Sequence, residues 1–556
     1  MAKYTLKAHL DHKYPTHKLV PQAIEFVRYA SKAGMLGGSS LKDSLEDFKT
    51  IKRWPSPDAS QLANAARKVP NKVALIDDAG ELTYAELLEM AKRLATGMIQ
   101  RNYGAGKNVA VMALNGRGII LPMLAYAMAG YNIFLMNVNS SPRQLEAILD
   151  FHDIDLLIAD EEFYESFEDA TKARPIIFSH LDSVQAPNGH ETIFDVIESI
   201  PVAAINLPEK PAKSVRVIMT SGTTGMPKGV IRLQRKLPVM GLPCVKNLPL
   251  KPERTWLLTA VLFHQYGWGY MCMAFGLQST VITRRHFSAE QVYSDIQKYG
   301  VNNWVTAASR IRALFKYLET EGIAQVPGLD IVLSSGSPLL PSEVEQVTEI
   351  LGPVLFNHYG SSESSAEAVS GPRELARDPR LTGHIPTGVT IEIRDEDGNA
   401  LPDGEIGEVW VHTYDMFGGY TDPTIKIPMQ DNFYFMGDRG YKFQDRLYVL
   451  GRADDLVITQ FGEKIQPSEI IDTLVQSEDI DDAFVCGVAD SDTGQALRAW
   501  VIPSEGANLS ADEVREFVTS RLSSAHRPRD VFFVSSLPMT PTGKVIKRDL
   551  PEHDTI

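Results

Sequence analysis

The chain has 556 residues and a formal net charge of −15, with 44% hydrophobic and 22% charged residues. Its length exceeds what one hydrophobic core serves, so several subdomains are expected, and its composition is that of a folded globular protein. The negative charge argues against a nucleic-acid-binding protein, because such binding depends on clustered Lys and Arg. The three cysteines, Cys244, Cys272 and Cys486, lie far apart, which excludes a disulfide framework or a zinc site and suits a reducing cytoplasm.

Two stretches are candidates for a signal peptide and for a membrane-spanning segment. The basic N-terminus, "MAKYTLKAHLDHKYPTHK", lacks the apolar core of a signal peptide. The stretch "IILPMLAYAMAGYNIFLMNV", Ile119 to Val138, is nearly long enough to cross a bilayer. Pro122 and two asparagines interrupt it, and Gly130 lies where a helix would stop. We therefore expect a buried helix, a turn and a core strand.

From about Ala59 onward, apolar strand-like segments alternate with amphipathic helical ones. The strand-like segments are "NVAVMAL", "LLIAD", "VRVIMT", "STVITR" and "NNWVTA". This alternation predicts an α/β fold with largely parallel sheets. Residues 390–450 differ, because "VTIEIRDEDGNALPDGEIGEVWVH" places Asp-Gly turns between alternating strands. That pattern predicts an antiparallel sheet or barrel.

After "VLGRADD", about a hundred further residues predict a small α+β unit. Its strands are expected at "DAFVCGVAD" and "RAWVIPSE", and its helix at residues 510–523. The expected organisation has three parts: an N-terminal extension (residues 1–58), a large α/β domain of layered sheets and helices with a distorted antiparallel barrel (59–452), and a small, mobile α+β C-terminal domain (453–556). The last boundary rests on the change of pattern, since no flexible linker marks it.

The stretch "TSGTTGMPKG", Thr220 to Gly229, combines hydroxyls, glycines and one lysine, as phosphate-binding loops do. It departs from the Gly-Lys-Ser/Thr loop that opens a helix, since Lys228 lies between Pro227 and Gly229, and proline has no N–H to offer a phosphate. A flexible glycine loop lets backbone N–H groups and hydroxyls follow the β- and γ-phosphates. Taken alone, the stretch could equally be a hairpin or a strand-to-helix turn.

Further motifs follow in order along the chain. They are "SSGSPL" from Ser334, "HYGSSE" from His358, "GEIGEVWV" from Gly404, "MGDRGY" from Met436, "GRADD" from Gly451, "GEKIQPSEI" from Gly462 and "PTGKVIKRDL" from Pro541. With "TSGTTG", this series resembles the adenylate-forming superfamily of acyl-CoA synthetases, luciferases and adenylation domains. The resemblance covers Leu82 ("LTYAEL") to Leu550 and is closest to long-chain fatty acyl-CoA synthetases. It implies an ATP-dependent acid:CoA ligase that forms an acyl-AMP and releases pyrophosphate, with ATP and coenzyme A as cosubstrates and Mg²⁺ as the metal.

The resemblance distributes the nucleotide-binding residues over several motifs. The glycine–hydroxyl loop would bind phosphates, with Lys228 as an added point charge or, alternatively, a solvated loop lysine. Tyr359 would stack on adenine, and Asp438 would accept hydrogen bonds from both ribose hydroxyls. Backbone contacts to adenine and an assisting arginine would complete the site. The expected set is Thr220, Ser221, Gly222, Thr223, Thr224, Gly225, Lys228, Gly336, Ser337, Tyr359, Gly360, Asp438 and Arg452.

By the same resemblance, three residues would act on the reacting phosphates. Glu363, which ends "YGSSE", would hold the magnesium ion; the other interpretation is an acidic residue at a helix N-terminus. Ser362 stands where the family usually has Thr, and it keeps the hydroxyl that reaches the α-phosphate. Lys544, in "PTGK", would contact the α-phosphate from a tight turn at Thr542 and Gly543, the other interpretation being a surface lysine.

This role for Lys544 implies a domain that moves. Once acyl-AMP has formed, the C-terminal domain would rotate about Asp454 in "GRADD", so that Lys544 leaves and the thiol enters. The other face of the domain would then present "FGEKIQP". In that stretch Gly462 would leave room for pantetheine, and Lys464 is a candidate contact for the phosphates of CoA.

The stretch "FHQYGWGYMCMAFG" is rich in aromatic residues and methionine, which suits an apolar acid. It offers no Asp to a substrate ammonium. Trp268 follows His264 by four residues, as in long-chain fatty acyl-CoA synthetases, where that tryptophan gates the acyl tunnel; helical core packing is the other interpretation. His264 is expected to line the acyl site. We therefore expect a medium- to long-chain fatty acid as the substrate.

The acceptor is expected to be CoA, because the chain stops twelve residues after Lys544 with no carrier domain attached. Two alternatives stay open: an adenylating enzyme with another outcome (a carrier-protein ligase or a β-lactone synthetase), and an inactive relative that binds acyl or nucleotide ligands. The expected location is the cytoplasm. Contact of the basic N-terminal extension with the anionic cytoplasmic face of a membrane is a further hypothesis, as is a homodimer.

Overall fold

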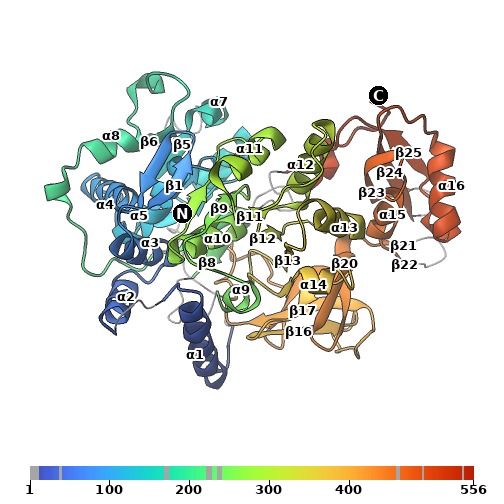
Figure 1. The fold of residues 1–556 in the computed structure, drawn as a ribbon, viewed down its shortest axis with the longest axis horizontal. Helices are drawn as coiled ribbons and strands as arrows, with labels where there is room; N and C mark the ends of the chain where they lie inside the picture. The colour runs from blue at the N-terminus through green and yellow to red at the C-terminus, as the bar shows by residue number, and fades with distance from the viewer. Residues whose placement is uncertain are drawn as a thin grey trace. The chain divides into compact units, whose positions relative to one another are not determined.

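The computed structural model of the chain has two compact units that alternate along the sequence (Figure 1). Unit 1 comprises Met1–Leu333, Gly360–Ala366 and Thr413–Ile427. Unit 2 comprises Ser334–Tyr359, Glu367–His412 and Pro428–Ile556. The structure describes residues 10, 12–36, 41–167, 174–220, 228–233, 241–337, 339–458, 464–490, 494–540 and 544–555.

Unit 1 is an α/β fold with two mainly parallel sheets. One sheet has the order β6-β5-β3-β4-β7-β8, in which only β7 and β8 pair antiparallel. In the other, β11, β9, β10 and β1 pair in parallel and β2 closes the edge antiparallel to β1. The α/β prediction is thus confirmed. The strands are β1 (Val73–Asp77), β2 (Gly80–Thr83), β3 (Asn108–Met112), β4 (Asn132–Leu135), β5 (Leu156–Asp160), β6 (Ile176–His180), β7 (Arg216–Thr220), β8 (Lys228–Arg232), β9 (Thr255–Leu258), β10 (Thr280–Ile282), β11 (Asn303–Thr306) and β12 (Ile331–Ser334).

The helices of unit 1 begin at local sequence signals. At the start of α4, the Thr83 hydroxyl accepts a hydrogen bond from the N–H of Glu86. The Glu86 carboxylate in turn accepts one from the N–H of Thr83, which completes a capping box. Ser141 caps α6 in the same way. The helices are α1 (Thr16–Lys32), α2 (Leu41–Arg53), α3 (Pro57–Lys68), α4 (Tyr84–Gln100), α5 (Arg117–Ala129), α6 (Pro142–Phe151), α7 (Tyr164–Phe167), α8 (Ile193–Glu198), α9 (Leu242–Asn247), α10 (Gln265–Gly276), α11 (Ala289–Tyr299) and α12 (Ala308–Thr320).

The long apolar stretch folds as the sequence predicts. α5 ends at Gly130, whose φ of 82° lies in the left-handed region that glycine adopts at no steric cost. After that turn, β4 enters the middle of its sheet. Every residue of α5 from Ile119 onward is buried. Over the described part of the chain, no helix is long and apolar enough to cross a membrane.

Unit 2 begins with strands in the order β16-β17-β19-β20-β15-β14-β13, in which β17–β19, β19–β20, β20–β15, β15–β14 and β14–β13 pair antiparallel. Gly398 and Gly404, of the predicted Asp-Gly turns, have φ of 86° and 91°. The antiparallel prediction for residues 390–450 is confirmed. The elements are α13 (Pro341–Ile350), β13 (Leu355–Tyr359), β14 (Ala368–Ser370), α14 (Pro372–Leu375), β15 (Gly383–His384), β16 (Val389–Arg394), β17 (Gly407–Thr413), β18 (Met429–Gln430), β19 (Phe433–Phe443) and β20 (Arg446–Arg452).

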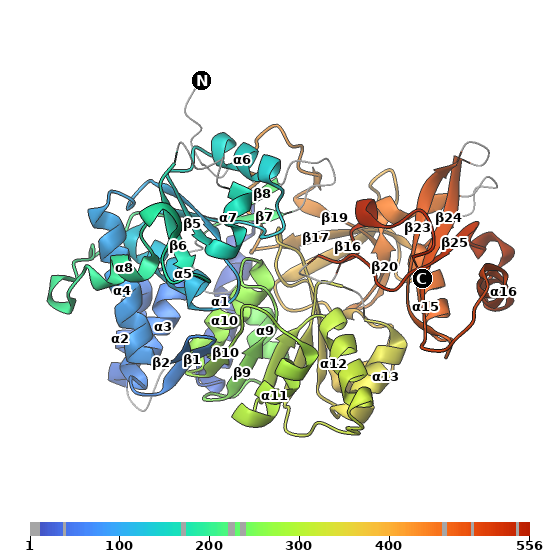
Figure 2. The ribbon, with the colours of Figure 1, turned by 90° about the horizontal axis from the view of Figure 1, so that it is seen from above.

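The C-terminal part of unit 2 buries a hydrophobic core of its own between Val457 and Val531. β24 pairs antiparallel with β23 and parallel with β25, and Figure 2 shows α15 and α16 beside these strands. The expected α+β pattern is present. The compact units divide elsewhere than at residue 452, so the domain boundaries stay a prediction. The elements are β21 (Val457–Ile458), β22 (Lys464–Ile465), α15 (Pro467–Leu474), β23 (Ile480–Asp490), β24 (Gly494–Pro503), α16 (Ala511–Arg521) and β25 (Asp530–Phe533).

Asp472, on α15, makes stability depend on pH. Burial raises the pKa of its carboxyl to about 6, with Arg380 opposing the shift and Glu343 and Glu469 adding to it. The folded-state pKa exceeds the ordinary value of 3.8, which means that the folded protein favours the protonated carboxyl. The contribution of Asp472 to the free energy of unfolding is therefore largest below pH 3.8 and is lost as the pH rises through about 6. We expect Asp472→Asn to raise the free energy of unfolding by roughly 1–3 kcal/mol at about pH 8 and to change it little at about pH 4. Urea unfolding at both pH values measures this, and an equal gain at both would contradict it.

Candidate active site

The predicted site residues divide between the two units, and each group is described by itself. Unit 1 holds the flanks of the phosphate loop, Gly360, Ser362, Glu363 and the acid-side residues. Unit 2 holds Gly336, Ser337, Tyr359, Asp438, Arg452 and Lys544. Some predictions lie outside the described residues: Ser221, Gly222, Thr223, Thr224, Gly225, Gly462, Thr542, Gly543 and the side chain of Lys464.

The flanks of the phosphate loop form a β-hairpin. β7 ends at Thr220, β8 begins at Lys228, and these two residues pair in the antiparallel ladder. The Thr220 hydroxyl donates to the carbonyl oxygen of Lys228 over 3.2 Å. The loop therefore joins two strands and does not open a helix, in agreement with its departure from the Gly-Lys-Ser/Thr pattern. Because β7 is parallel to β4, the loop leaves the sheet at its carboxyl edge, where open α/β sheets bind ligands.

A cation, a phenol and a carboxylate are linked beside this hairpin. The Tyr420 hydroxyl donates to Glu363 Oε1 over 3.0 Å, and Lys228 Nζ lies 5.6 Å from the centroid of the Tyr420 ring. Gly229 permits the arrangement, since a Cβ there would come within 2.4 Å of Thr421 Oγ1. The lysine can attract phosphate, and the carboxylate can hold Mg²⁺. The sequence analysis did not identify Tyr420.

A buried arginine holds the turn that carries Ser362 and Glu363. Arg232 Nη1 donates to both of their carbonyl oxygens, over 3.1 and 3.0 Å. The guanidinium also pairs with Asp415 at 2.8 Å. Ser361 Oγ accepts from the N–H of Glu363 over 3.2 Å. Glu363 therefore lies in a turn rather than at a helix N-terminus, and its backbone is positioned by groups other than its own carboxylate.

Glu363 could bind a magnesium ion only together with oxygen ligands from the nucleotide and from water. Within the described ranges, no group of three or more His, Cys, Asp or Glu could hold a metal. An ion at Glu363 would therefore complete its coordination with phosphate oxygens and water, as Mg²⁺ in nucleotide sites does.

In unit 2, the residues predicted for adenine and ribose touch each other. The Tyr359 hydroxyl donates to Asp438 Oδ2 over 2.5 Å. Asp438 lies opposite Arg452 in the β19–β20 ladder, and Arg452 Nη1 is 3.4 Å from Asp438 Oδ1. Gly437 makes room for this pair, because a Cβ there would meet the Arg452 guanidinium at 2.6 Å. The ladder thus fixes a carboxylate and a guanidinium beside the Tyr359 phenol.

The charges around Asp438 include that of Lys544. Burial raises the pKa of the Asp438 carboxyl, and Arg452, the Tyr359 hydroxyl and Lys544 oppose the shift. Burial, the Asp438 charge and the hydrogen bond to Asp438 raise the pKa of the Tyr359 phenol well above its usual value, so the phenol remains a donor. Lys544 thus acts electrostatically on the predicted ribose carboxylate.

Lys544 is held by backbone and side-chain hydrogen bonds to Thr540, and the predicted hinge residue lies in a 3-10 turn. The N–H of Thr540 donates to the carbonyl of Lys544 over 2.7 Å, and the N–H of Lys544 donates to Thr540 Oγ1 over 3.0 Å. Asp454 lies in the 3-10 turn Ala453–Asp455, directly after β20, and is 3.3 Å from Arg452 Nε. Arg452 therefore contacts both the predicted ribose carboxylate and the predicted hinge residue.

The predicted backbone contacts to adenine lie just before α13. Gly336 has a φ of 92°, a conformation that glycine favours. The hydroxyl of Ser337 is buried and has no hydrogen-bond partner in the described part of the chain. A buried hydroxyl without a partner costs free energy. A bound ligand with a polar edge would relieve that cost.

Removal of the Asp438 carboxylate should weaken ATP binding. We expect Asp438→Ala to raise the KM for ATP by about 10- to 100-fold, the usual loss when a hydrogen bond to a charged group is removed. ATP–pyrophosphate exchange measures the KM, and thermal melting reports whether the variant stays folded. Asp445→Ala is the matched control, because Asp445 lies at the exposed turn between β19 and β20, with His384 at 3.0 Å. If Asp438→Ala bound ATP like the wild type, the ribose assignment would be wrong.

Among the residues predicted to line the site of the carboxylic acid substrate, Trp268 contacts two buried charged side chains. The residue is 2% exposed and lies on α10, four residues after the helix N-cap His264. Its indole N–H donates to the Asp58 carboxylate, and the Arg216 guanidinium carbon lies 3.1 Å from its ring centroid. Arg216 and Asp58 are 3.8 Å apart and both are buried. Trp268 is therefore held by both members of a buried ion pair.

The same cluster has further polar members. Asp58 accepts from the hydroxyls of Ser56 and Tyr126, the latter over 3.1 Å, and Arg216 Nη2 donates to Gln265 Oε1 over 3.0 Å. Asp58 and Arg216 were not predicted as site residues, since they lie outside every motif of the sequence. The cluster fits the core-packing interpretation of Trp268. The gating role of Trp268 and the acid-site role of His264 stay predictions.

Known proteins resemble this chain over most of its length. The sequence model of the AMP-binding enzyme family matches residues 62–421, and that of the AMP-binding enzyme C-terminal domain matches residues 469–544. A sulfoacetate–CoA ligase from Cupriavidus necator is 28% identical over 509 residues, 89% of this chain and 97% of that protein. A 2-succinylbenzoate–CoA ligase from Bacillus licheniformis is 25% identical over 493 residues, 88% of this chain and 98% of that protein.

The fold is also shared with solved structures. An anthranilate CoA ligase in complex with anthranoyl-AMP matches with a TM-score of 0.80 at 20% identity, over 88% of this chain and 95% of the other. This likeness confirms the predicted fold class, a large α/β part followed by a smaller C-terminal part.

Proposed function

This chain belongs to the AMP-binding enzyme family, and from that premise we propose which acid it activates. It is an ATP-dependent acid:CoA ligase of the AMP-forming class, with ATP and CoA as cosubstrates. Acid and ATP give an acyl-AMP and pyrophosphate, and CoA then takes the acyl group and releases AMP. The proposal concerns the size of the acid: we propose a compact acid, short or aromatic, that ends at Trp268.

This proposal rests on the contacts that Asp58 and Arg216 make with the Trp268 side chain. A long acyl chain could pass only if the indole moved aside, as a gate does. That movement would break the N–H bond to Asp58 and remove the ring from Arg216. It would leave two buried charges with fewer partners, which is costly in a low-dielectric interior. We therefore place the end of the acid site at the indole.

The three relatives named above are in line with the same size class, since they act on sulfoacetate, 2-succinylbenzoate and anthranilate. A fatty acid–[acyl-carrier-protein] ligase from Streptomyces coeruleorubidus is also 25% identical, so the relatives alone do not decide the size of the acid. The medium- to long-chain fatty acid expected from the resemblance rested on the His264-to-Trp268 spacing. That spacing is compatible with a fixed tryptophan as well as with a moving one.

We propose the following roles for the chain's own residues, as the resemblance implies. Asp438 would accept the ribose hydroxyls and Tyr359 would offer its ring to adenine. Lys228 and the hairpin loop would bind the outer phosphates, and Ser362 and Lys544 the α-phosphate. Mg²⁺ bound at Glu363 would neutralise phosphate charge. Lys544 adds a positive charge where the α-phosphate becomes more negative, which lowers the barrier to attack by the carboxylate.

An acid panel with Trp268→Ala tests the proposal. AMP release with CoA is measured for short, aromatic and long-chain acids. We expect the wild type to prefer the compact acids. Trp268→Ala should shift kcat/KM toward longer acids by about tenfold or more, since one methylene accommodated in an apolar pocket is worth about 1–3 kcal/mol. The KM for ATP should stay the same.

Trp268→Phe is the matched variant, because it keeps a ring beside Arg216 and lacks the N–H that Asp58 accepts. It should fall between the wild type and Trp268→Ala. If the wild-type enzyme were most active on long-chain acids, the proposed compact acid would be wrong and the substrate would be a fatty acid. Lost stability with an unchanged acid profile would assign Trp268 to core packing alone. Thioester formation with free CoA separates a CoA ligase from a carrier-protein ligase.

A further inference from the structure

Two N-terminal helices outside the matched family regions expose apolar side chains. Val20, Ile24 and Val27 of α1 are 57%, 65% and 37% exposed, and Leu45 and Phe48 of α2 are 62% and 54% exposed. Half of the exposed large hydrophobic residues in the described part of the chain lie within these 29 positions. Such clustering marks an interaction surface, because single exposed apolar residues are ordinarily scattered.

The helical spacing places these side chains on outward faces. Val20, Ile24 and Val27 lie at positions i, i+4 and i+7, which share one face of a helix. The opposite face of α1 is buried, with Phe26 at 5% and Ala30 at 0% exposure. On α2, Leu45 and Phe48 are three positions apart and lie opposite the buried Asp47.

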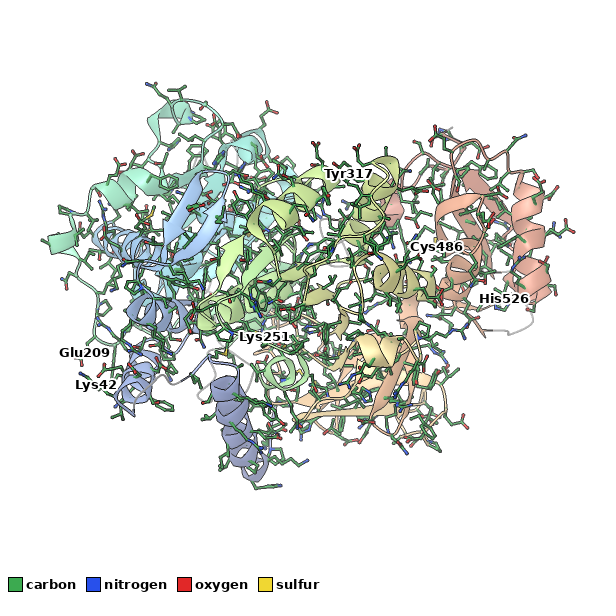
Figure 3. The ribbon with its side chains drawn as sticks, viewed as in Figure 1. Lys42, Glu209, Lys251, Tyr317, Cys486 and His526 are labelled. Atoms are coloured by element: carbon green, nitrogen blue, oxygen red, sulfur yellow. The ribbon has the colours of Figure 1, made fainter. Side chains whose placement is uncertain are left out.

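Positive charge surrounds these apolar residues. Residues 16–53 contain seven Lys or Arg and four Asp or Glu, a formal net charge of +3 in a chain of −15. On α2, Lys42, Lys49 and Lys52 share a stripe with Leu45, since their spacing follows the helical repeat. Figure 3 labels Lys42 at the outer edge of α2.

The acidic residues of this segment are neutralised, and most of its cations are not. Glu25 pairs with Lys246, Asp43 with Arg67, Glu46 with Lys49, and Asp47 with Arg67 and Lys68, at 2.7–2.9 Å. Among the residues that the structure describes, six cations of the segment have no ion pair. They are Lys18, Arg28, Lys32, Lys42, Lys52 and Arg53.

We propose that α1 and α2 form a docking surface for an anionic lipid membrane. The N-terminal surface, defined as Val20, Ile24, Val27, Leu45 and Phe48 with these six cations, has the composition of a helix that lies in a membrane interface. Its apolar side chains would enter the boundary between headgroups and acyl chains. Its cations would meet anionic headgroups, with an attraction that falls within a Debye length.

The charge also argues against a second copy of this chain as the occupant. A symmetric dimer contact brings the same patch of both subunits together. Here that contact would place six cations with no ion pair on each side of one interface. Like charges facing each other oppose such association. In Figure 1, α1 and α2 lie at one edge of unit 1.

Sedimentation of the full-length protein with vesicles tests the proposal. Vesicles of phosphatidylcholine with phosphatidylglycerol should bind the protein about tenfold or more tightly than phosphatidylcholine alone. Binding should fall by at least about tenfold when salt rises from about 0.1 to about 0.5 M. Leu45→Ser/Phe48→Ser and Lys42→Glu/Lys52→Glu should each lower the partition constant by about tenfold or more.

Matched variants elsewhere on the molecule serve as controls. Ile406→Ser/Phe443→Ser removes two apolar side chains that are 50% and 54% exposed, and Lys210→Glu/Lys213→Glu reverses two exposed lysines. Both should bind vesicles like the wild type. Acid activation without vesicles should be unchanged in every variant, which separates this proposal from the proposed acid specificity.

Three results would overturn the proposal. One is equal binding of wild type and N-terminal variants to the anionic vesicles. Another is binding that does not depend on anionic lipid. The third is a dimer in solution that Leu45→Ser/Phe48→Ser dissociates, since the surface would then be covered by a second copy.

Discussion

Lys544→Ala should stop acyl-AMP formation from acid and ATP while leaving thioester formation from synthetic acyl-AMP and CoA near the wild-type rate. The first step builds negative charge on the α-phosphate, and Lys544 is the predicted cation at that point. Loss of one such pre-placed contact costs roughly 3–4 kcal/mol, a factor of about 10²–10³ in rate. ATP–pyrophosphate exchange measures the first step, and thioester release from acyl-AMP measures the second.

The expected asymmetry follows from where Lys544 lies. Burial raises the pKa of Asp438 and the Lys544 charge opposes it, so the lysine acts on the predicted ribose carboxylate in this structure. The Lys544 side chain is nevertheless exposed, so its removal sacrifices no core packing. After rotation about Asp454, the lysine would face solvent and make no contact that differs between ground state and transition state.

Arg548→Ala is the matched control for this prediction. Arg548 is 71% exposed on the same C-terminal segment, and its nearest acidic partner is the adjacent Asp549, at 3.4 Å. Its loss should leave both steps intact. Equal damage to both steps in Lys544→Ala would rule out the rotating domain, and an undamaged first step would rule out the α-phosphate contact.

The features that the sequence predicted well are those with local causes. Gly130 ends a helix because its own backbone can adopt a positive φ, and the Thr83–Glu86 capping box starts one through bonds three residues apart. The hairpin nature of the phosphate loop was left open, because both a strand and a helix can follow a glycine loop. The antiparallel ladder of β7 and β8 decided it.

The features that the sequence did not predict depend on side chains far apart in the chain. Arg232 is near the phosphate loop in sequence, yet it supports the turn at Glu363, about 130 residues away. Asp58 and Arg216 lie 158 positions apart in the sequence, yet in the folded chain they contact each other and the same Trp268 side chain. No periodicity or motif encodes such a meeting, since it depends on how α3, β7 and α10 pack. The compact acid proposed here therefore differs from the medium- to long-chain acid expected from the sequence.

Asp58→Ala should destabilise the protein more than any other single change considered. Asp58 is fully buried and is the carboxylate partner of Arg216, which is 4% exposed and whose Nε has no hydrogen-bond partner within the described residues. Removing one partner of a buried pair leaves an uncompensated charge and costs roughly 3–5 kcal/mol. Urea unfolding measures the change.

Asp47→Ala is the matched control for Asp58→Ala. Asp47 is equally buried, at 1%, but its partners Arg67 and Lys68 reach solvent, with side chains 32% and 14% exposed. Those cations can be hydrated when the carboxylate is lost. The cost should therefore be only about 1–2 kcal/mol. Equal losses in the two variants would show that burial of the carboxylate, rather than the stranded cation, sets the cost.

The double variant Asp58→Leu/Arg216→Met should separate stability from positioning. Replacing a buried ion pair by apolar side chains of similar volume is often neutral or stabilising, so most of the roughly 3–5 kcal/mol should return. Trp268 would then keep an apolar surrounding but lose the acceptor of its N–H and the cation over its ring. Its indole could move, and the acid profile should shift toward longer acids as in Trp268→Ala, with the KM for ATP unchanged. A stable double variant with the wild-type acid profile would mean that packing alone fixes the tryptophan and that the buried charges do not set the length of the acid.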